Sequence, residues 1–219
     1  MKLKYQLSNE TITSNNKTFY RIEALKDFSD VKKGELGGYV EALDNLSQQG
    51  NSWVYDKAKV SGDAKVFGNA RVSDDAIVSD DAIVSDDVKV FGNAEVSGNA
   101  CIYGNAIVSG DAKVLGYAKV YSDAIVSGYA RVSGDAMVFG SAEVTGTAWV
   151  YNNAMIFGDV KVYGRARVSG NACIYGNAIV SGDVAASHEI CQIKRLRLHY
   201  FLILSLSLNV LSIAVIIWK

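Results

Sequence analysis

The chain has 219 residues, 49% of them apolar and 21% charged, and its 22 basic and 23 acidic residues leave a net charge of −1. This composition excludes a disordered chain, and the balanced charge gives no overall attraction for nucleic acid. Three cysteines are too few for a disulfide framework. The sequence divides into four segments, residues 1–53, 54–184, 185–199 and 200–218.

Residues 1–53 lack the pattern that follows and predict an N-terminal cap. Thr11–Thr13 and Thr18–Ile22 flank the turn-forming Ser14–Lys17, which is typical of a β-hairpin. A repetitive β fold exposes strand edges and apolar core at its ends, so a structural cap is expected there. A ligand site in the loop around Gly37 and Gly38 is the alternative.

Residues 54–184 contain a six-residue repeat, Ala-x-Val-x-Gly-Asn/Asp. Valine or isoleucine occupies every sixth position from Val54 to Val180 without a gap. This period excludes a helix, whose apolar face recurs about every 3.6 residues. Alanine and valine two residues apart point to one side of a short strand, and Gly-Asn or Gly-Asp forms a corner. The repeat therefore predicts an all-β, parallel β-solenoid.

Two observations indicate that three consecutive repeats form one coil. Asp87–Asp111 recurs as Asp159–Asp183, an offset of twelve repeats, which equals four coils of three. Sampling every third repeat from Phe67 to Tyr175 also finds aromatic residues at six of seven positions. The sequence predicts about seven such coils.

The repeat resembles that of left-handed β-helix proteins with hexapeptide repeats. The flanking segments Leu25–Phe28, Leu36–Val40 and Asn45–Asp56 resemble the YdcK-like group, whose members are described as acyltransferases. The resemblance extends from Lys4 to Asp183. It implies a left-handed coil and acyl transfer as the activity.

The C-terminal region predicts a membrane anchor. Residues 185–199 are expected to form a helical stalk, and residues 200–218 carry no charge and are long enough for one transmembrane helix. Lys194, Arg195 and Arg197 precede this span and only Lys219 follows it, which predicts that the solenoid lies on the cytoplasmic side. A buried C-terminal helix docked on the solenoid is the alternative.

Candidate chemistry is sparse. Acyltransferases of the resembling type generally use a histidine base, but the solenoid has none, and His188 and His199 lie in the stalk. The paired aspartates at 74–75, 80–81 and 86–87 fall on three different corners, which disfavours a calcium site. Cys101 and Cys173 are too far apart for a disulfide. We predict no catalytic or metal-binding residue and no cofactor.

An outward aromatic column is the candidate interface. This face is unusually apolar for an outward surface. The second column beside the aromatic one consists of Lys65, Ile83, Cys101, Lys119, Met137, Met155 and Cys173. Stacking between coils alone is the alternative explanation. Arg131 lies on a polar face and is treated as an inert position. The candidate interface residues are Phe67, Tyr103, Tyr121, Phe139, Phe157, Tyr175, Met137 and Met155.

The sequence thus predicts a membrane-anchored solenoid that acts as a structural, assembly or binding module without catalysis. Its expected partners are a second copy or another protein at the aromatic face and the membrane at the C-terminal helix, with no nucleic acid. One alternative is an acyltransferase-like enzyme with its site at the N-terminal cap. Another is a scaffold that polymerises.

Overall fold

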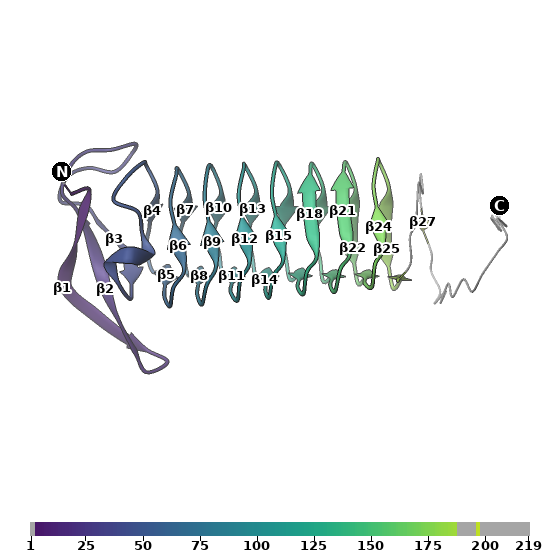
Figure 1. Ribbon diagram of the computed structural model, residues 1–219, viewed down its shortest axis with the longest axis horizontal. Coiled ribbons are helices and arrows are strands. Elements are labelled where there is room, and N and C mark those ends of the chain that lie inside the picture. Colours follow the sequence, from purple (N-terminus) through teal and green to yellow (C-terminus); the bar gives the residue numbers. More distant parts are fainter. Residues whose placement is uncertain (1–2, 188–195, 198–219) are drawn as a thin grey trace, which may run out of the picture.

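The computed structural model describes residues 3–187 and 196–197, and in that part the chain is an all-β solenoid (Figure 1). Strands that recur along one long axis wind into about eight turns, with the cap at one end. Each six-residue unit forms a short strand and then a corner, so three units complete a turn. Val90 pairs in parallel with Val108, three units later. The predicted parallel solenoid and the length of its turn are confirmed.

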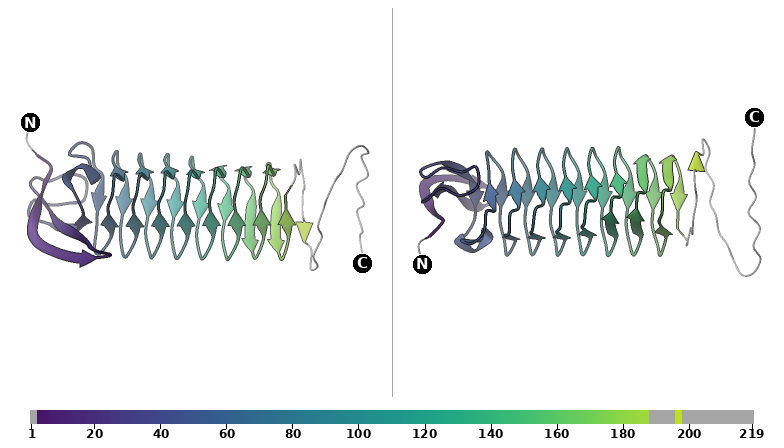
Figure 2. Two further views of the ribbon diagram at one scale, coloured as in Figure 1. Left: turned by 60° about the horizontal axis from the view of Figure 1, so that its bottom comes forward. Right: turned by 90° about the horizontal axis from the view of Figure 1, so that it is seen from above.

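Three β-sheets form the walls of the solenoid, and the two further views show the same stacked turns (Figure 2). Wall A is the eleven-stranded sheet and includes the cap strands β1 (Tyr5–Ser14), β2 (Lys17–Ala24) and β3 (Leu36–Val40). Its solenoid strands are β5 (Lys59–Val60), β8 (Ile77–Val78), β11 (Glu95–Val96), β14 (Lys113–Val114), β17 (Arg131–Val132), β20 (Trp149–Val150), β23 (Arg167–Val168) and β26 (Ala185–Ala186).

Walls B and C consist of solenoid strands alone. The nine strands of wall B are β4 (Trp53–Val54), β7 (Arg71–Val72), β10 (Lys89–Val90), β13 (Ile107–Val108), β16 (Ile125–Val126), β19 (Glu143–Val144), β22 (Lys161–Gly164), β25 (Ile179–Gly182) and β27 (Leu196–Arg197). The seven strands of wall C are β6 (Lys65–Val66), β9 (Ile83–Val84), β12 (Cys101–Ile102), β15 (Lys119–Val120), β18 (Met137–Gly140), β21 (Met155–Gly158) and β24 (Cys173–Ile174).

The core is formed by the alanine and valine columns that the repeat defines. Every member of these columns from Val54 to Val180 is at most 2% exposed. Removing a valine side chain from water contributes roughly 1.5 kcal/mol or more, and the walls repeat this contribution at each strand. The small alanines leave room for the walls to converge at the corners.

The corners depend on residues with positive φ. Gly98 has φ of 70°, and a Cβ there would lie 2.9 Å from the amide nitrogen of Gly116 in the next turn. Asp80 has φ of 61°, and its carboxylate accepts a hydrogen bond of 2.9 Å from the amide of Gly98. Aspartate therefore replaces glycine where its side chain can bind the following turn.

The cap begins with the predicted β-hairpin. Strands β1 and β2 pair antiparallel around Asn15 and Asn16, whose φ values of 51° and 59° suit a tight two-residue turn. The 3₁₀ helix η1 (Leu43–Asn45) follows β3, and the Asn45 side chain donates to the carbonyl oxygens of Gly62 and Ala64. These bonds join the cap to the solenoid.

The solenoid starts earlier than the strict repeat indicates, which gives about eight turns instead of the predicted seven. Val40 pairs in parallel with Val60, and Leu46 forms a bridge with Val66. Both spacings are two residues longer than the three units of a regular turn, so a search for a six-residue period does not find this first turn.

Gly37 and Gly38 are buried in β3. A Cβ on Gly37 would lie 2.5 Å from the carbonyl oxygen of Val54 and 2.7 Å from the side chains of Ile22 and Trp53. The two glycines therefore let β3 approach the next turn closely. The ligand site considered for the loop around these glycines stays a prediction.

The end of the described chain continues the solenoid. The predicted helical stalk at 185–199 contains two described stretches, and both are strands: β26 pairs with β23, and β27 pairs with β25. Val184 and Ala186 continue the two core columns, which explains the extended conformation of β26. The predicted transmembrane helix at 200–218 lies outside the described residues. Within the described part, no helix is long and apolar enough to cross a membrane.

Candidate interaction surface and cap groove

Five aromatic side chains on wall C form a continuous stack. Tyr103, Tyr121, Phe139, Phe157 and Tyr175 follow one another with ring centroids 4.7 to 5.3 Å apart and ring planes within 12° of parallel. The strand register sets this spacing, because parallel strands place equivalent residues of successive turns side by side. We call these five residues the aromatic stack. The prediction that a turn of three repeats aligns them is confirmed.

The other predicted interface residues lie on the same wall. Met137 and Met155 pair in β18 and β21 and are half-buried. Phe67 follows β6 and is 40% exposed, but Ser85 lies between it and Tyr103 in the column, so it does not join the stack. Ile83 of β9 is 38% exposed and extends the apolar surface.

The tyrosines of the stack are partly buried. Burial raises the pKa of Tyr103, with smaller contributions from Tyr121 and Cys101, and burial also raises the pKa of Tyr121. Both phenols therefore stay neutral over the physiological range. The stack itself carries no charge, but Lys119 of β15 is exposed on the same wall, between Cys101 and Met137 in the neighbouring column.

Several other sequence predictions concern the ends of the chain. His188, His199, Lys194 and Arg195 lie outside the described residues, and Arg197 ends β27. The orientation predicted from the basic residues beside residues 200–218 stays a prediction.

The aspartate pairs act in the corners of the solenoid. The carboxylates of Asp74, Asp80 and Asp86 each accept a hydrogen bond from the amide of a glycine in the next turn, at 2.8 to 3.0 Å. Across the described residues, no three His, Cys, Asp or Glu side chains are placed to hold a metal ion together. Cys101 and Cys173 lie in β12 and β24, four turns apart, a separation of roughly 19 Å.

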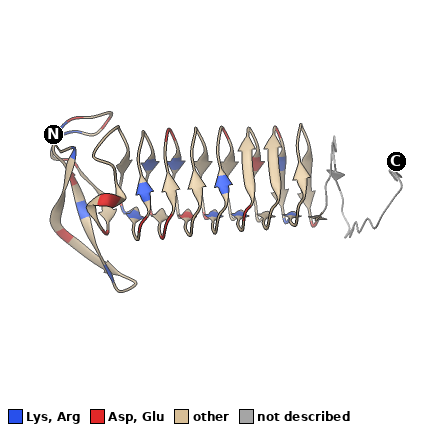
Figure 3. Ribbon diagram, viewed as in Figure 1, with Lys and Arg blue, Asp and Glu red and all other residues tan. Residues whose placement is uncertain are grey.

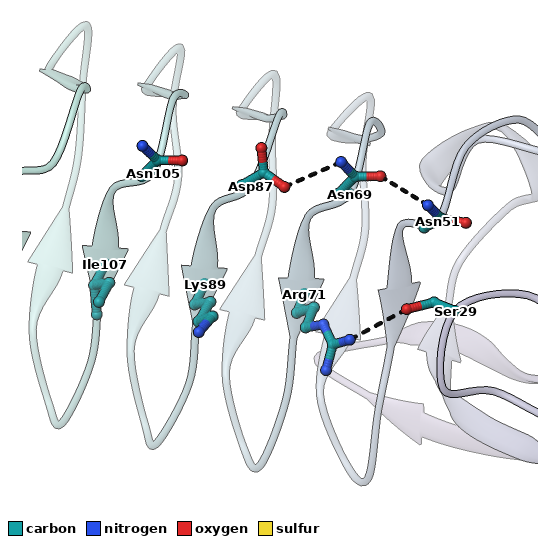
Figure 4. A pocket seen from close by; sticks show the side chains of 8 residues that line it. All are labelled: Ser29, Asn51, Asn69, Arg71, Asp87, Lys89, Asn105 and Ile107. Carbon is teal, nitrogen blue, oxygen red and sulfur yellow. Dashed lines mark hydrogen bonds between the residues drawn. The ribbon is translucent and has the colours of Figure 1, made fainter.

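A groove of about 500 Å³ lies where the cap meets wall B, and the sequence did not predict it (Figure 4). A ladder of polar side chains runs along one side, in which Asn51 donates to Asn69 and Asn69 donates to Asp87, each at 3.0 Å. The groove is lined by Ser29, Asn51, Asn69, Arg71, Asp87, Lys89, Asn105 and Ile107.

The cap side of the groove is held by an ion pair. The Arg71 guanidinium donates to both carboxylate oxygens of Asp30, at 2.9 and 3.0 Å, and to the hydroxyl of Ser29. Tyr55 donates to the same carboxylate at 3.0 Å. Arg71 is thus engaged with the cap, and Lys89 is the cation in the groove that the described residues leave without an ion pair. In the sequence, the feature that could have indicated this groove is the pair of cations Arg71 and Lys89, which lie three repeats apart and therefore in consecutive turns of wall B.

Comparison with known proteins finds the same repeat. Residues 64–80, 70–86 and 130–146 match the family model described as the YdcK β-solenoid repeat. The curated protein "Uncharacterized acetyltransferase YdcK" of Escherichia coli strain K12 is 35% identical over 66 residues. This match covers 26% of the present chain and 20% of that protein, so the chain spans about a fifth of its relative. The chain therefore contains YdcK-type repeats and is similar to YdcK, as the sequence predicted.

Among solved structures, the chain is similar to a UDP-N-acetylglucosamine acyltransferase from Francisella novicida. The identity is 15% and the TM-score 0.28, over 67% of this chain and 66% of that chain. At this level the likeness supports no inference about activity.

Proposed function

We propose that this protein is a structural and binding module that pairs with a second copy of itself through wall C. The observation that carries the proposal is the aromatic stack on an outward surface. Met137, Met155 and Ile83 lie in the neighbouring column, in which Lys119 is the charged residue beside the stack. Soluble proteins rarely expose a contiguous apolar surface of this kind without a partner.

A second copy fits this surface because both would have the same spacing. The rings of the stack repeat every 4.7 to 5.3 Å, close to the spacing of the strands that carry them. In a two-fold arrangement the same residues meet on both copies, so the outer edges of the two aromatic stacks would lie against each other. Corner residues would form the polar rim of such an interface.

The test is the molar mass of the full chain, measured by light scattering in a mild detergent because residues 200–218 are strongly apolar. We expect a dimer, and we expect Phe139→Lys with Phe157→Lys to give a folded monomer. Outside an interface these lysines reach water, but inside one they would be desolvated at a cost of several kcal/mol.

The matched control is Ser127→Lys with Thr145→Lys. These residues occupy the equivalent position of the repeat in two consecutive turns of wall B, so the pair adds the same charge on a different wall. It should leave the dimer intact. A wild-type chain that is monomeric at tens of micromolar would contradict the proposal.

The membrane anchor at residues 200–218 and the cytoplasmic position of the solenoid remain proposals that rest on the sequence. The full chain is expected to stay with membranes during alkaline carbonate extraction. Release of the intact chain would contradict an anchor. Left-handed winding likewise rests on the resemblance to hexapeptide-repeat proteins.

Acyl transfer at the cap groove is the second candidate, favoured by the name of the E. coli relative and by the position of the groove. In such a reaction an acceptor amine or hydroxyl attacks the thioester carbonyl, the carbon–sulfur bond breaks, and the thiol leaves with the acceptor's proton. Asp87 is the carboxylate in the groove that could accept this proton, and Lys89 could hold an anionic group.

The test of this candidate is thiol release from acetyl-coenzyme A in the presence of amine or sugar acceptors. Turnover that depends on an acceptor and is lost in both Asp87→Asn and Lys89→Gln would favour the enzyme. We expect no such turnover. The mass measurement and the thiol assay are independent, so each candidate can fail alone.

A further inference from the structure

Wall A carries a second stack, which consists of a tryptophan between two arginines. Arg131, Trp149 and Arg167 lie in β17, β20 and β23, where they pair in register. The two guanidinium carbons lie 5.2 and 5.1 Å from the Trp149 ring, one on each side. Trp149 is 39% exposed, so the stack is at the surface. We call these three residues the arginine clamp.

The tryptophan fixes both arginines while leaving their donors available. A guanidinium within about 6 Å of the centre of an aromatic ring, over its face, is attracted to the ring electrostatically and can still donate from its N–H groups. Among the described residues, neither arginine forms a hydrogen bond or an ion pair with another side chain. The clamp therefore presents two pre-oriented sets of donors, separated by two strand spacings or roughly 10 Å.

The surroundings of the clamp leave it with a net positive charge. Lys113, in the preceding strand of wall A, is paired with Glu95. Arg165, at the corner before β23, lies 3.6 Å from Asp183. These two pairs are neutral, so the charges of Arg131 and Arg167 are not compensated by neighbouring carboxylates.

We propose that the arginine clamp binds an acidic segment of a partner protein through two carboxylates about 10 Å apart. Two glutamates separated by two helical turns on one helix face have this spacing, because one turn of a helix rises about 5.4 Å. Each carboxylate would accept paired N–H bonds from one guanidinium, the geometry that makes these bonds strong. The clamp lies on wall A, so it is separate from the aromatic stack of wall C.

The structure favours an acidic peptide over a nucleic acid. Both faces of Trp149 are covered by arginines, which leaves no ring face for a base to stack on. Acidic and basic residues are interspersed along the solenoid and form no continuous basic stripe (Figure 3). On the corner shared by walls A and B, Asp74, Asp75 and Asp111 would repel a phosphate backbone laid along the axis.

The experiment measures fluorescence anisotropy with the full chain in mild detergent. The probe is a fluorescein-labelled helical peptide of twenty residues with two glutamates seven positions apart, and the reference peptide has glutamines in their place. We expect the glutamate peptide to bind at least tenfold more tightly at low salt. Arg131→Gln with Arg167→Gln should weaken its binding at least tenfold, and the corresponding lysine pair should restore only part of it.

The matched control is Lys57→Gln with Lys59→Gln, which removes two positive charges near wall A at the cap end. This pair should leave the affinity within twofold of wild type. Circular dichroism should show that both variants are folded, since all four side chains reach the surface.

Three results would overturn the proposal. The control pair could weaken binding as much as the clamp pair, which would indicate unspecific charge attraction. The glutamine peptide could bind as well as the glutamate peptide. A single-stranded oligonucleotide could bind more tightly than the peptide and lose this affinity in the clamp variant, which would assign the clamp to nucleic acid.

Discussion

The cap and the solenoid are stabilised in opposite ways. In the solenoid, one contact is repeated at every turn: a buried valine packs on its equivalent in the neighbouring turn, as Val108 does on Val90 and Val126. In the cap, single residues make contacts that occur once. The single O–H of Tyr5, for example, is shared between the carbonyl oxygens of Leu43 and Leu46, which lie 2.6 and 2.9 Å from the hydroxyl oxygen.

This difference determines what one substitution can do. In a repeat protein the free energy of unfolding is close to a sum of similar contributions from neighbouring turns. A substitution that weakens one of these contacts therefore removes only one contribution of many. The cap closes the apolar end of the core with one aromatic cluster, in which Tyr5 and Phe28 contact the Trp53 ring edge-on at 6.0 and 5.3 Å. No second copy of this cluster exists in the described chain.

The largest effect is therefore expected from Trp53→Ala. Trp53 is fully buried, and its loss leaves a large cavity between the cap and the first turn, at a cost of about 3–5 kcal/mol. Val120→Ala in the middle of the solenoid should cost about 2 kcal/mol, since it removes two methyl groups and leaves a smaller cavity. Urea unfolding followed by circular dichroism measures both. Equal losses would show that the cap is no more sensitive than a turn.

The two regions also differed in how far the sequence predicted them. The strict period of the repeat sets the strand register, and the register determines which side chains stack, so the aromatic stack could be read from spacing alone. The cluster of Tyr5, Phe28 and Trp53 joins residues far apart in the sequence and has no period. Long-range contacts of this kind depend on the fold and leave no local pattern.

Inside the solenoid, the sequence pattern did not predict the contacts between stacked side chains of different chemistry. The repeat places Arg131 on a polar face and predicts no contact for it, but its guanidinium lies over the ring of Trp149. A search for one residue type in each column cannot find an arginine–tryptophan–arginine stack. Similarly, Lys89 and Asp87 become part of a groove only because the cap loop at Ser29 lies beside them.

The second prediction uses pH to separate the two regions. The Lys4 side chain is buried in the cap, where its ammonium donates to the carbonyl oxygen of Ser52 at 2.8 Å, and burial, with a smaller effect of Lys26, lowers its pKa to about 8. Between pH 8 and 10 the unfolded chain keeps this proton and the folded chain loses it. Stability should therefore rise with pH, by at most about 1.4 kcal/mol per pH unit.

Above about pH 10 the sign is expected to reverse. Burial raises the pKa of Tyr5 and of Tyr55, so both keep their protons in the fold while the unfolded chain loses them. Stability then falls as pH rises. Urea midpoints between pH 7 and 11 test this, with Lys4→Met as the control that should remove the rise below pH 10. A variant whose curve runs parallel to that of the wild type would exclude Lys4 as the cause.

A smaller effect is expected at a corner. Gly98→Ala places a Cβ in a left-handed conformation and 2.9 Å from the amide nitrogen of Gly116, which should cost about 1–3 kcal/mol. Asp80→Gly removes the strain of a left-handed conformation at another corner, but it also removes the hydrogen bond that the Gly98 amide donates to the Asp80 carboxylate. The two effects oppose each other, so the cost should stay under about 1 kcal/mol. Thermal unfolding of both variants measures this order, and the reverse order would show that the side-chain bond outweighs the backbone strain.

The last prediction concerns the coupling between two neighbouring rings of the aromatic stack, and it tests whether the contributions of successive turns to stability add. Tyr121 has a stacked ring on each side, at 4.7 Å from Tyr103 and from Phe139, whereas Tyr103 begins the stack and has Ser85 before it in the column. Because leucine keeps much of the apolar area and loses the stacking, Tyr121→Leu should cost about 1–2 kcal/mol and Tyr103→Leu about half of that.

Urea unfolding of the two single variants and the double variant gives the coupling directly. The double variant should cost less than the sum of the singles, because the Tyr103–Tyr121 contact is lost in both. A purely additive result would mean that the rings stabilise the solenoid by burial alone, and the parallel geometry would then be a consequence of the register.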